Sequence, residues 1–108
     1  MKLWIDDMRP APAGYVWAKS VFEAKQKIKY HEALYKYNPQ YFNDDEIELI
    51  DIDHDAGDYA CDGGDYIKLL DWLEETGRNY PIRIHSQNSV GIANMRRIIQ
   101  RNGWKEVF

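Results

Sequence analysis

The sequence has one cysteine in 108 residues and no long hydrophobic run. A lone Cys61 cannot form an internal disulfide, which excludes a disulfide-stapled secreted domain and points to a reducing cytoplasm. No stretch approaches the roughly 18 apolar residues that cross a bilayer, and the apolar residues at the N-terminus are too few for a secretion signal. We therefore expect a cytoplasmic protein that contacts no membrane.

Positive charge is missing from the middle of the chain. Residues 37–67 contain no Lys or Arg but ten of the eighteen acidic residues, and the net charge is -4. Because a mostly acidic protein is a poor non-specific binder of nucleic acid, no non-specific DNA binding is expected.

The composition that remains suits one packed domain. Hydrophobic residues make up 44% of the chain and aromatic residues 14%. The length allows a single core and is too short for two. The sequence therefore predicts one ordered domain over residues 1–108.

Hydrophobic patterning predicts strands that alternate with helices. The expected strands are Lys2–Ile5, Tyr15–Ala18, Glu48–Ile52, Pro81–His85 and Trp104–Phe108. The expected helices run from Ser20 to about Tyr37, from about Asp65 to Thr76, and from Ser89 to Arg101. This alternation predicts an α/β fold with a mainly parallel sheet.

Capping and turn residues predict where the helices begin and end. Ser20 and Glu23 form a capping box, and Ser89 is expected to cap the last helix. Asn38-Pro39 is expected to end the first helix, before a turn at residues 43–45.

Carboxylates follow two of the expected strands at the point where each strand ends. Asp6 and Asp7 follow the first strand, and Asp53 follows the third. Carboxyl ends of parallel strands share one edge of a sheet, so these groups are expected to meet there. Two bare carboxylates about 4 Å apart repel by roughly 4 kcal/mol near a protein surface, so the cluster needs a cation or shared protons. An all-oxygen set suits Mg²⁺ or Mn²⁺.

Two histidines and a serine are expected at the same edge. His54 and His85 could act as general base and general acid in attack on a phosphate, although one histidine alone is more often structural. Ser86 could contact a phosphoryl oxygen or hydrogen-bond to loop backbone.

Three further polar residues have two interpretations each. Arg9 could clamp a phosphate or pair with Asp55 or Asp58. Asn88 is a loop former first and a phosphate ligand second. Asp51, inside an expected strand, is either on an edge or paired with an arginine of a neighbouring strand.

These motifs resemble the receiver domains of response regulators. In that family an acidic pair follows strand one, an aspartate ends strand three, and Ser or Thr ends strand four, which correspond here to Asp6-Asp7, Asp53 and Ser86. The resemblance implies a three-layer, receiver/flavodoxin-like fold with five strands in the order 2-1-3-4-5 and a reduced helix set. The Pro-rich segment Met8–Gly14 replaces the first helix, and the family's lysine after strand five has no counterpart.

A smaller family, the cyclic-phosphate-processing receiver-like domains, resembles the chain more closely. Its motifs correspond to Asp6-Asp7-Met8-Arg9-Pro10, Asp53-His54-Asp55 and His85-Ser86-Gln87-Asn88. The family name implies a phosphoesterase activity on cyclic phosphates.

The expected function is a metal-dependent phosphoesterase that acts on a cyclic or diester phosphate, such as a cyclic nucleotide or an RNA end. The expected metal ligands are Asp6, Asp7 and Asp53, with Mg²⁺ or Mn²⁺ as the cofactor. The expected catalytic residues are His54, His85 and Ser86, and the expected phosphate-binding residues are Arg9, Ser86 and Asn88.

Two other functions stay open from the sequence. A signalling module would accept a phosphoryl group on Asp53, and the missing lysine counts against it. An interaction domain would bind a partner through tyrosines such as Tyr30, Tyr35 and Tyr41, and histidines that point away from the acidic cluster would favour it.

Overall fold

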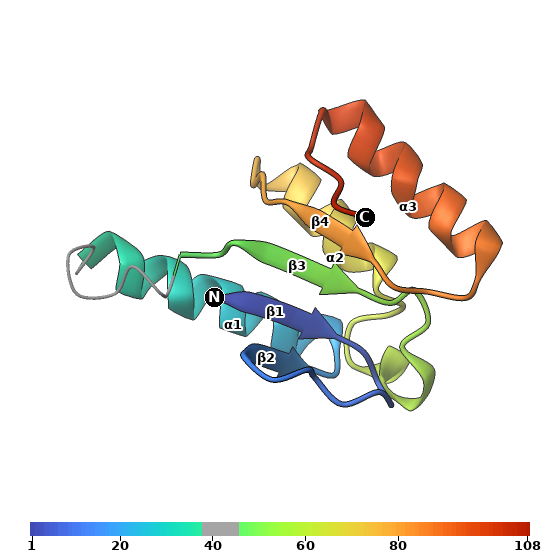
Figure 1. Ribbon diagram of the computed structural model, residues 1–108, viewed down its shortest axis with the longest axis horizontal. Helices are drawn as coiled ribbons and strands as arrows, with labels where there is room; N and C mark the ends of the chain where they lie inside the picture. Colours follow the sequence, from blue (N-terminus) through green and yellow to red (C-terminus); the bar gives the residue numbers. More distant parts are fainter. Residues whose placement is uncertain (38–45) are drawn as a thin grey trace.

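Four short parallel strands form the sheet in the part of the chain that the structure, a computed structural model, describes: residues 1–37 and 46–108. The strands are β1 (Lys2–Ile5), β2 (Tyr15–Ala18), β3 (Leu49–Ile52) and β4 (Ile82–Ile84). They lie in the order β2-β1-β3-β4, and every neighbouring pair is parallel (Figure 1). The predicted α/β receiver-like class is confirmed, with four strands instead of five.

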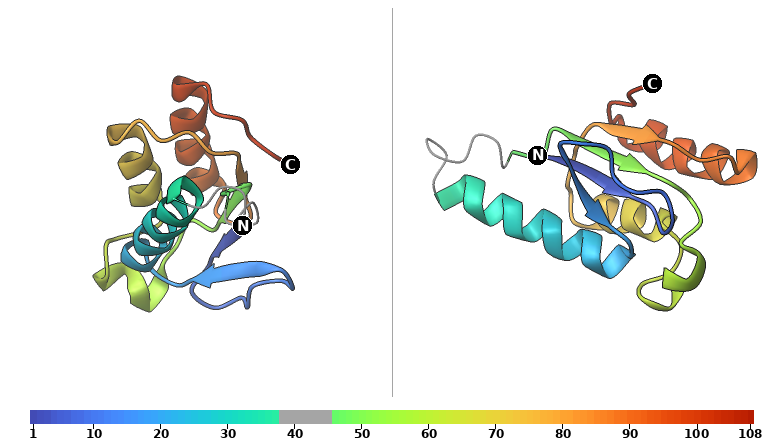
Figure 2. Two further views of the ribbon diagram at one scale, coloured as in Figure 1. Left: turned by 90° about the vertical axis from the view of Figure 1, so that its left-hand side faces the viewer. Right: turned by 60° about the horizontal axis from the view of Figure 1, so that its bottom comes forward.

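The three α-helices of the described residues lie on one side of this sheet (Figure 2). They are α1 (Val21–Tyr37), α2 (Ile67–Glu75) and α3 (Ser89–Asn102). Right-handed crossovers place α1 and α2 on the same face, because both connections run in the same direction across the sheet. The connection from β1 to β2 runs in the opposite direction and belongs to the other face. That connection, residues 6–14, is not helical, as the prolines predicted. The described residues therefore form two layers, a sheet and one layer of helices, instead of the expected three (Figure 2).

The expected fifth strand, Trp104–Phe108, is wrong. This segment forms an isolated parallel bridge between Glu106 and Ile82 of β4. The Ile82 amide donates to Lys105 O at 2.9 Å, and the Val107 amide donates to Ile82 O at 2.8 Å. The pairing is confined to this one position of β4, so the segment forms a bridge and not a strand.

Helix α1 has its predicted N-cap, and the N-cap of α3 lies one residue earlier than predicted. Ser20 Oγ accepts a hydrogen bond from the Glu23 amide at 3.0 Å. Asn88, not Ser89, is the N-cap of α3, and its side chain accepts from the Gly91 amide at 2.9 Å. Either residue type can cap a helix, so the sequence alone does not separate two adjacent candidates.

Alternation along the strands divides the side chains between the two faces of the sheet. One face of β1 and β3 is fully buried together with three leucines of α2. The residues are Leu3, Ile5, Ile50, Ile52, Leu69, Leu70 and Leu73. Their strand neighbours Trp4 and Asp51 are register partners on the opposite, helix-free face. The main core therefore lies between sheet and helices.

Some expectations fall outside the described residues: the helix end at Asn38-Pro39, the turn at residues 43–45, and Tyr41. Within the described residues, no helix has the length and apolar character needed to cross a membrane.

Candidate active site

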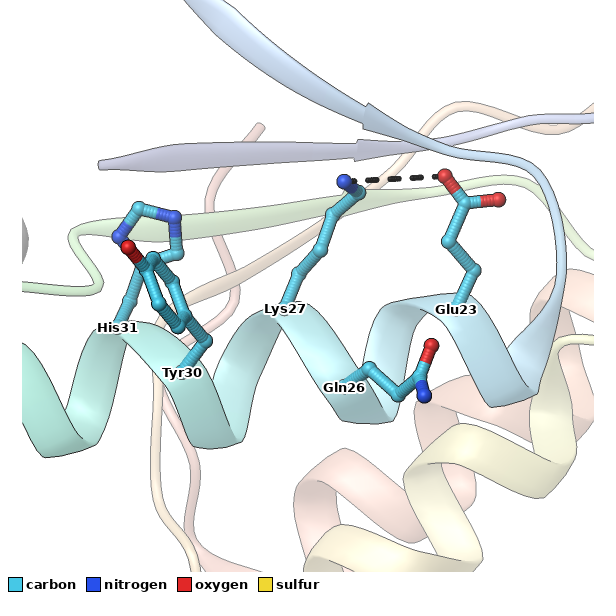
Figure 3. Close-up of a pocket in the computed structure, with 5 residues that line it drawn as sticks. All are labelled: Glu23, Gln26, Lys27, Tyr30 and His31. Carbon is cyan, nitrogen blue, oxygen red and sulfur yellow. Dashed lines mark ion pairs between the residues drawn. The ribbon is translucent and has the colours of Figure 1, made fainter.

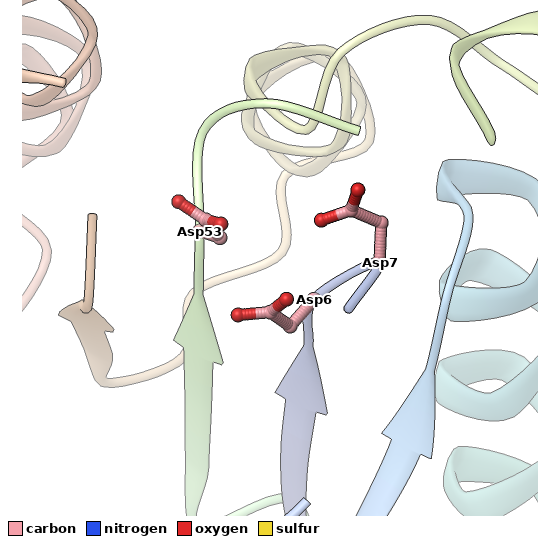
Figure 4. Close-up of side chains that lie close together, drawn as sticks. All are labelled: Asp6, Asp7 and Asp53. Carbon is pink, nitrogen blue, oxygen red and sulfur yellow. The ribbon is translucent and has the colours of Figure 1, made fainter. Parts of the chain in front are cut away.

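Three carboxylates meet at the carboxyl ends of β1 and β3. Asp6 and Asp7 follow β1 directly, and Asp53 follows β3. One oxygen from each carboxylate lies within 4.8 Å of the others (Figure 4). The two strands are parallel neighbours, which is why residues far apart in the sequence come together here.

Asp6 is the most buried member of this acidic cluster. Its Oδ1 accepts hydrogen bonds from the amides of Met8 and Arg9, both at 2.9 Å. Burial raises the pKa of the Asp6 carboxyl, but these amides and His85 outweigh it, so the pKa lies below its ordinary value. The two amide hydrogen bonds to Asp6 fix the start of the connection from β1 to β2.

Asp7 is the member of the cluster with the least compensated charge. Burial raises the pKa of its carboxyl above the ordinary value, and the negative charges of Asp6 and Asp53 raise it further. Among the described residues, Asp6 and Asp53 form ion pairs but Asp7 forms none. Added positive charge at this place would relieve the repulsion.

Gly57 makes the room in which the Asp7 carboxylate sits. A Cβ on Gly57 would lie 2.3 Å from Asp7 Oδ2, and the backbone there has a φ of +56°. Only glycine meets both conditions without strain. Sequence reasoning missed this role, since the glycine lay in a loop with several others.

Asp53 is the third member of the acidic cluster, and Arg9 is the cation that pairs with it. Asp53 Oδ1 accepts a hydrogen bond from the His54 amide at 2.8 Å. Arg9 Nη2 lies 3.7 Å from Asp53 Oδ2, and Arg9 Nε lies 3.3 Å from Asp6 Oδ2. Arg9 therefore pairs with Asp6 and Asp53, rather than with Asp55 or Asp58. Half of its side chain, 51%, stays exposed, so the guanidinium can also reach a ligand.

His85 is the histidine that reaches the acidic cluster. Its Nε2 lies 3.0 Å from Asp6 Oδ2, and its Nδ1 lies 2.6 Å from Asp51 Oδ1. The ring stacks on Trp4, with centroids 3.7 Å apart and planes 5° from parallel. These contacts hold the imidazole at one edge of the cluster.

Asp51 belongs to this arrangement, which the sequence did not predict. Its side chain is 1% exposed and pairs with Arg83 Nη1 at 3.1 Å as well as with His85. Of the two interpretations open from the sequence, the pair with an arginine of a neighbouring strand is confirmed. The available signal was a single carboxylate inside an otherwise apolar strand.

His54, Ser86 and Asn88 form a second group beside the first turn of α3. His54 Nδ1 lies 2.8 Å from Asp55 Oδ1, and Asn88 Nδ2 lies 3.4 Å from the same carboxylate. Ser86 Oγ accepts from the Asn88 amide at 3.1 Å. The polar contacts of these side chains are thus with one another and with Asp55 and Gly91, and none is with the three clustered aspartates.

A separate surface hollow lies on α1. It is lined by Glu23, Gln26, Lys27, Tyr30 and His31 (Figure 3). Lys27 Nζ lies 3.8 Å from Glu23 Oε1 in this hollow. Tyr30 is 62% exposed there, as the interaction-domain interpretation requires, but none of the clustered aspartates lines it. The hollow and the acidic cluster are distinct features.

Comparisons with known proteins give one match. A family model described as "Cyclic-phosphate processing Receiver domain" matches residues 1–101. No curated protein and no solved structure matches the chain. The family resemblance seen in the sequence motifs is confirmed.

Proposed function

Because this chain belongs to the family of cyclic-phosphate-processing receiver domains, we propose that it is a metal-dependent phosphoesterase that hydrolyses a cyclic or diester phosphate. The observation that carries this proposal is the meeting of Asp6, Asp7 and Asp53, with oxygens within 4.8 Å of one another, beside a histidine held by its own partners. Phosphate transfer depends mainly on positioning and charge stabilisation, and this group of side chains can supply both.

The donor set fits a hard divalent cation. Asp7 and Asp53 suit direct coordination, since Asp7 forms no ion pair among the described residues and Asp53 Oδ2 has a long contact of 3.7 Å to Arg9. Asp6 suits a supporting position, because both of its oxygens already have protein partners. Mg²⁺ or Mn²⁺ bound here would polarise a phosphoryl oxygen and offset transition-state charge.

The remaining residues would bind the phosphate and move protons. The half-exposed Arg9 would hold phosphate oxygens. His85 would exchange a proton at Nε2, the ring nitrogen that faces the acidic cluster. His54, Ser86 and Asn88 would contact the substrate from the neighbouring loop, which requires Asn88 to keep its capping bond with Gly91 while its amide nitrogen turns to the phosphate.

Two measurements test the proposal. Isothermal titration should detect Mn²⁺ or Mg²⁺ binding to the wild-type protein and none to Asp53→Asn. Purified protein with Mn²⁺ should hydrolyse one or more 2′,3′-cyclic nucleotides or generic phosphodiesters, and His85→Ala should not. Equal metal affinity in the wild type and Asp53→Asn would remove the proposal.

A receiver-type signalling module is the second candidate. Asp53 follows β3 and lies beside Asp7 and Arg9, the place where the resemblance puts a phosphoacceptor. This candidate requires a stable mass increase on Asp53 after incubation with acetyl phosphate, absent in Asp53→Asn. Phosphodiester hydrolysis without such an adduct would favour the phosphoesterase.

A further inference from the structure

A buried carboxylate lies on the helix-free face of the sheet and has no part in the core. Asp51 is fully buried in the middle of β3. A charged side chain in this position is costly, and replacing such a group with an apolar one often leaves a protein as stable or more so. The fold therefore gives no reason of its own for an aspartate here.

The partners of Asp51 supply a reason. Its Oδ1 lies 2.6 Å from His85 Nδ1, and its Oδ2 lies 3.1 Å from Arg83 Nη1. With each oxygen bound to a different donor, the carboxylate cannot rotate freely. We propose that Asp51 is a positioning residue that fixes the His85 ring with a proton on Nδ1, so that Nε2 faces the acidic site. This inference rests on the proposed function for the part that concerns catalysis.

Three independent restraints then act on one imidazole. The Asp51 carboxylate holds Nδ1, Trp4 packs against the ring plane, and Asp6 Oδ2 lies 3.0 Å from Nε2. Trp4 is itself fixed, because its indole N–H donates to Arg9 O at 2.8 Å. A ring held this way presents Nε2 in one direction, which is what a proton-transfer group needs.

The Asp51→Asn variant keeps the shape of the side chain but reverses the direction of its hydrogen bond with His85 Nδ1. Arg83 can only donate, so the asparagine oxygen must turn toward Arg83. The asparagine NH₂ then faces His85 and donates to Nδ1, which has to be unprotonated. The ring keeps its place, with Nε2 still 3.0 Å from Asp6 Oδ2, but Nδ1 has lost its proton. The variant imidazole is therefore no longer held as a proton donor between two carboxylates, and it has one proton fewer to give to a leaving group.

Long-range proton–nitrogen NMR spectra of the imidazole test this directly. The wild-type protein should have a proton on His85 Nδ1, and Asp51→Asn should have none there. Arg83→Gln is the matched control, because it changes the donor on the other oxygen and should leave the Nδ1 proton in place. An unprotonated Nδ1 in the wild type overturns the inference even if the variant fails to fold.

Enzyme kinetics then distinguish a role of Asp51 in positioning His85 for catalysis from a role in folding stability alone. With Mn²⁺ and bis(p-nitrophenyl) phosphate, Asp51→Asn should lose about 100-fold or more in kcat, with Mn²⁺ affinity unchanged. Arg101→Gln, which removes an ion pair with Glu74 away from the site, should keep the wild-type kcat. A wild-type kcat in folded Asp51→Asn overturns the catalytic part. If the wild type hydrolyses nothing but shows the Nδ1 proton, the proposed function fails while the positioning of His85 stands.

Discussion

At the residue scale, the acidic site depends on small details of packing around each carboxylate. Asp7 needs the space beside Gly57, Asp6 needs two backbone amides, and His85 needs Asp51. Charged residues at the strand ends could be predicted because polar residues after apolar runs are visible in the sequence. Gly57 and Asp51 could not be assigned, because their roles depend on which side chains lie opposite them in the fold.

Replacing Gly57 with alanine should damage the site and the fold together. The new Cβ would lie 2.3 Å from Asp7 Oδ2, on a backbone with a φ of +56°. We expect a loss of about 1–3 kcal/mol in the free energy of unfolding and a marked loss of Mn²⁺ affinity, measured by urea unfolding and titration calorimetry.

Gly14→Ala is the matched control for this substitution. Gly14 has a φ of +85° with nothing within 4 Å of the added Cβ, so its cost is backbone strain alone. Gly14→Ala should keep wild-type Mn²⁺ affinity. Equal loss of affinity in both variants would mean that the space beside Asp7 is irrelevant to the metal.

At the element scale, side chains from different elements fix α1 and α3 against their neighbours. Gly91 in the first turn of α3 allows the His54 ring to pack against the helix, and Glu32 of α1 binds Arg78 and Tyr80, between α2 and β4. Patterning predicted the strands Lys2–Ile5 and Tyr15–Ala18 with their observed bounds. It failed at Trp104–Phe108, since pairing there depends on contacts with β4, which form at one position alone, and not on local propensity.

The effect of Gly91→Ala on the free energy of unfolding should have opposite signs in the wild type and in a His54→Ala variant. In the wild type the new Cβ would lie 2.4 Å from His54 Cγ, so the variant should lose about 1–3 kcal/mol of stability. In a His54→Ala background the contact is gone, and alanine should stabilise the helix by up to about 1 kcal/mol over glycine. A double-mutant cycle by urea unfolding measures this, and the same cost in both backgrounds would contradict the packing.

The ion pair between α1 and Arg78 should make stability depend on pH. Burial raises the pKa of Glu32, but Arg78 and Tyr80 outweigh it, so the pKa lies below its ordinary value of 4.5. A depressed carboxyl pKa stabilises the fold above 4.5 and loses that contribution as the pH falls through the folded value. Urea unfolding of wild type and Glu32→Gln should therefore converge in acid and differ at neutral pH; a constant difference would contradict this.

At the scale of the whole molecule, all three helices of the described residues cover one face of the sheet, and the other face carries Trp4, Asp51 and His85. The order of strands and helices could be predicted because βα alternation and right-handed crossovers leave few topologies. The role of the helix-free face could not be predicted from alternation alone. A charged Asp51 inside an apolar strand is explained by its contact with His85, and that contact depends on the fold.

Metal binding should stabilise the whole domain. A ligand that binds only the folded state adds about 2.7 kcal/mol at a concentration 100 times its Kd. Mn²⁺ should therefore raise the melting temperature of the wild type and leave Asp53→Asn unchanged, as followed by circular dichroism. An equal rise in both proteins would place the ion on other acidic residues.

The most direct test of the account is the order in which Mn²⁺ broadens the backbone amide signals in an NMR titration, because the ion is paramagnetic and its effect falls steeply with distance. Titration of the wild-type protein should broaden the backbone amide signals of Asp6, Asp7 and Asp53 first, and those of the acidic residues Glu48, before β3, and Glu74, in the last turn of α2, later. Broadening that begins at Glu48 or Glu74, or that spreads evenly over the acidic surface, would contradict a cation site at the ends of β1 and β3.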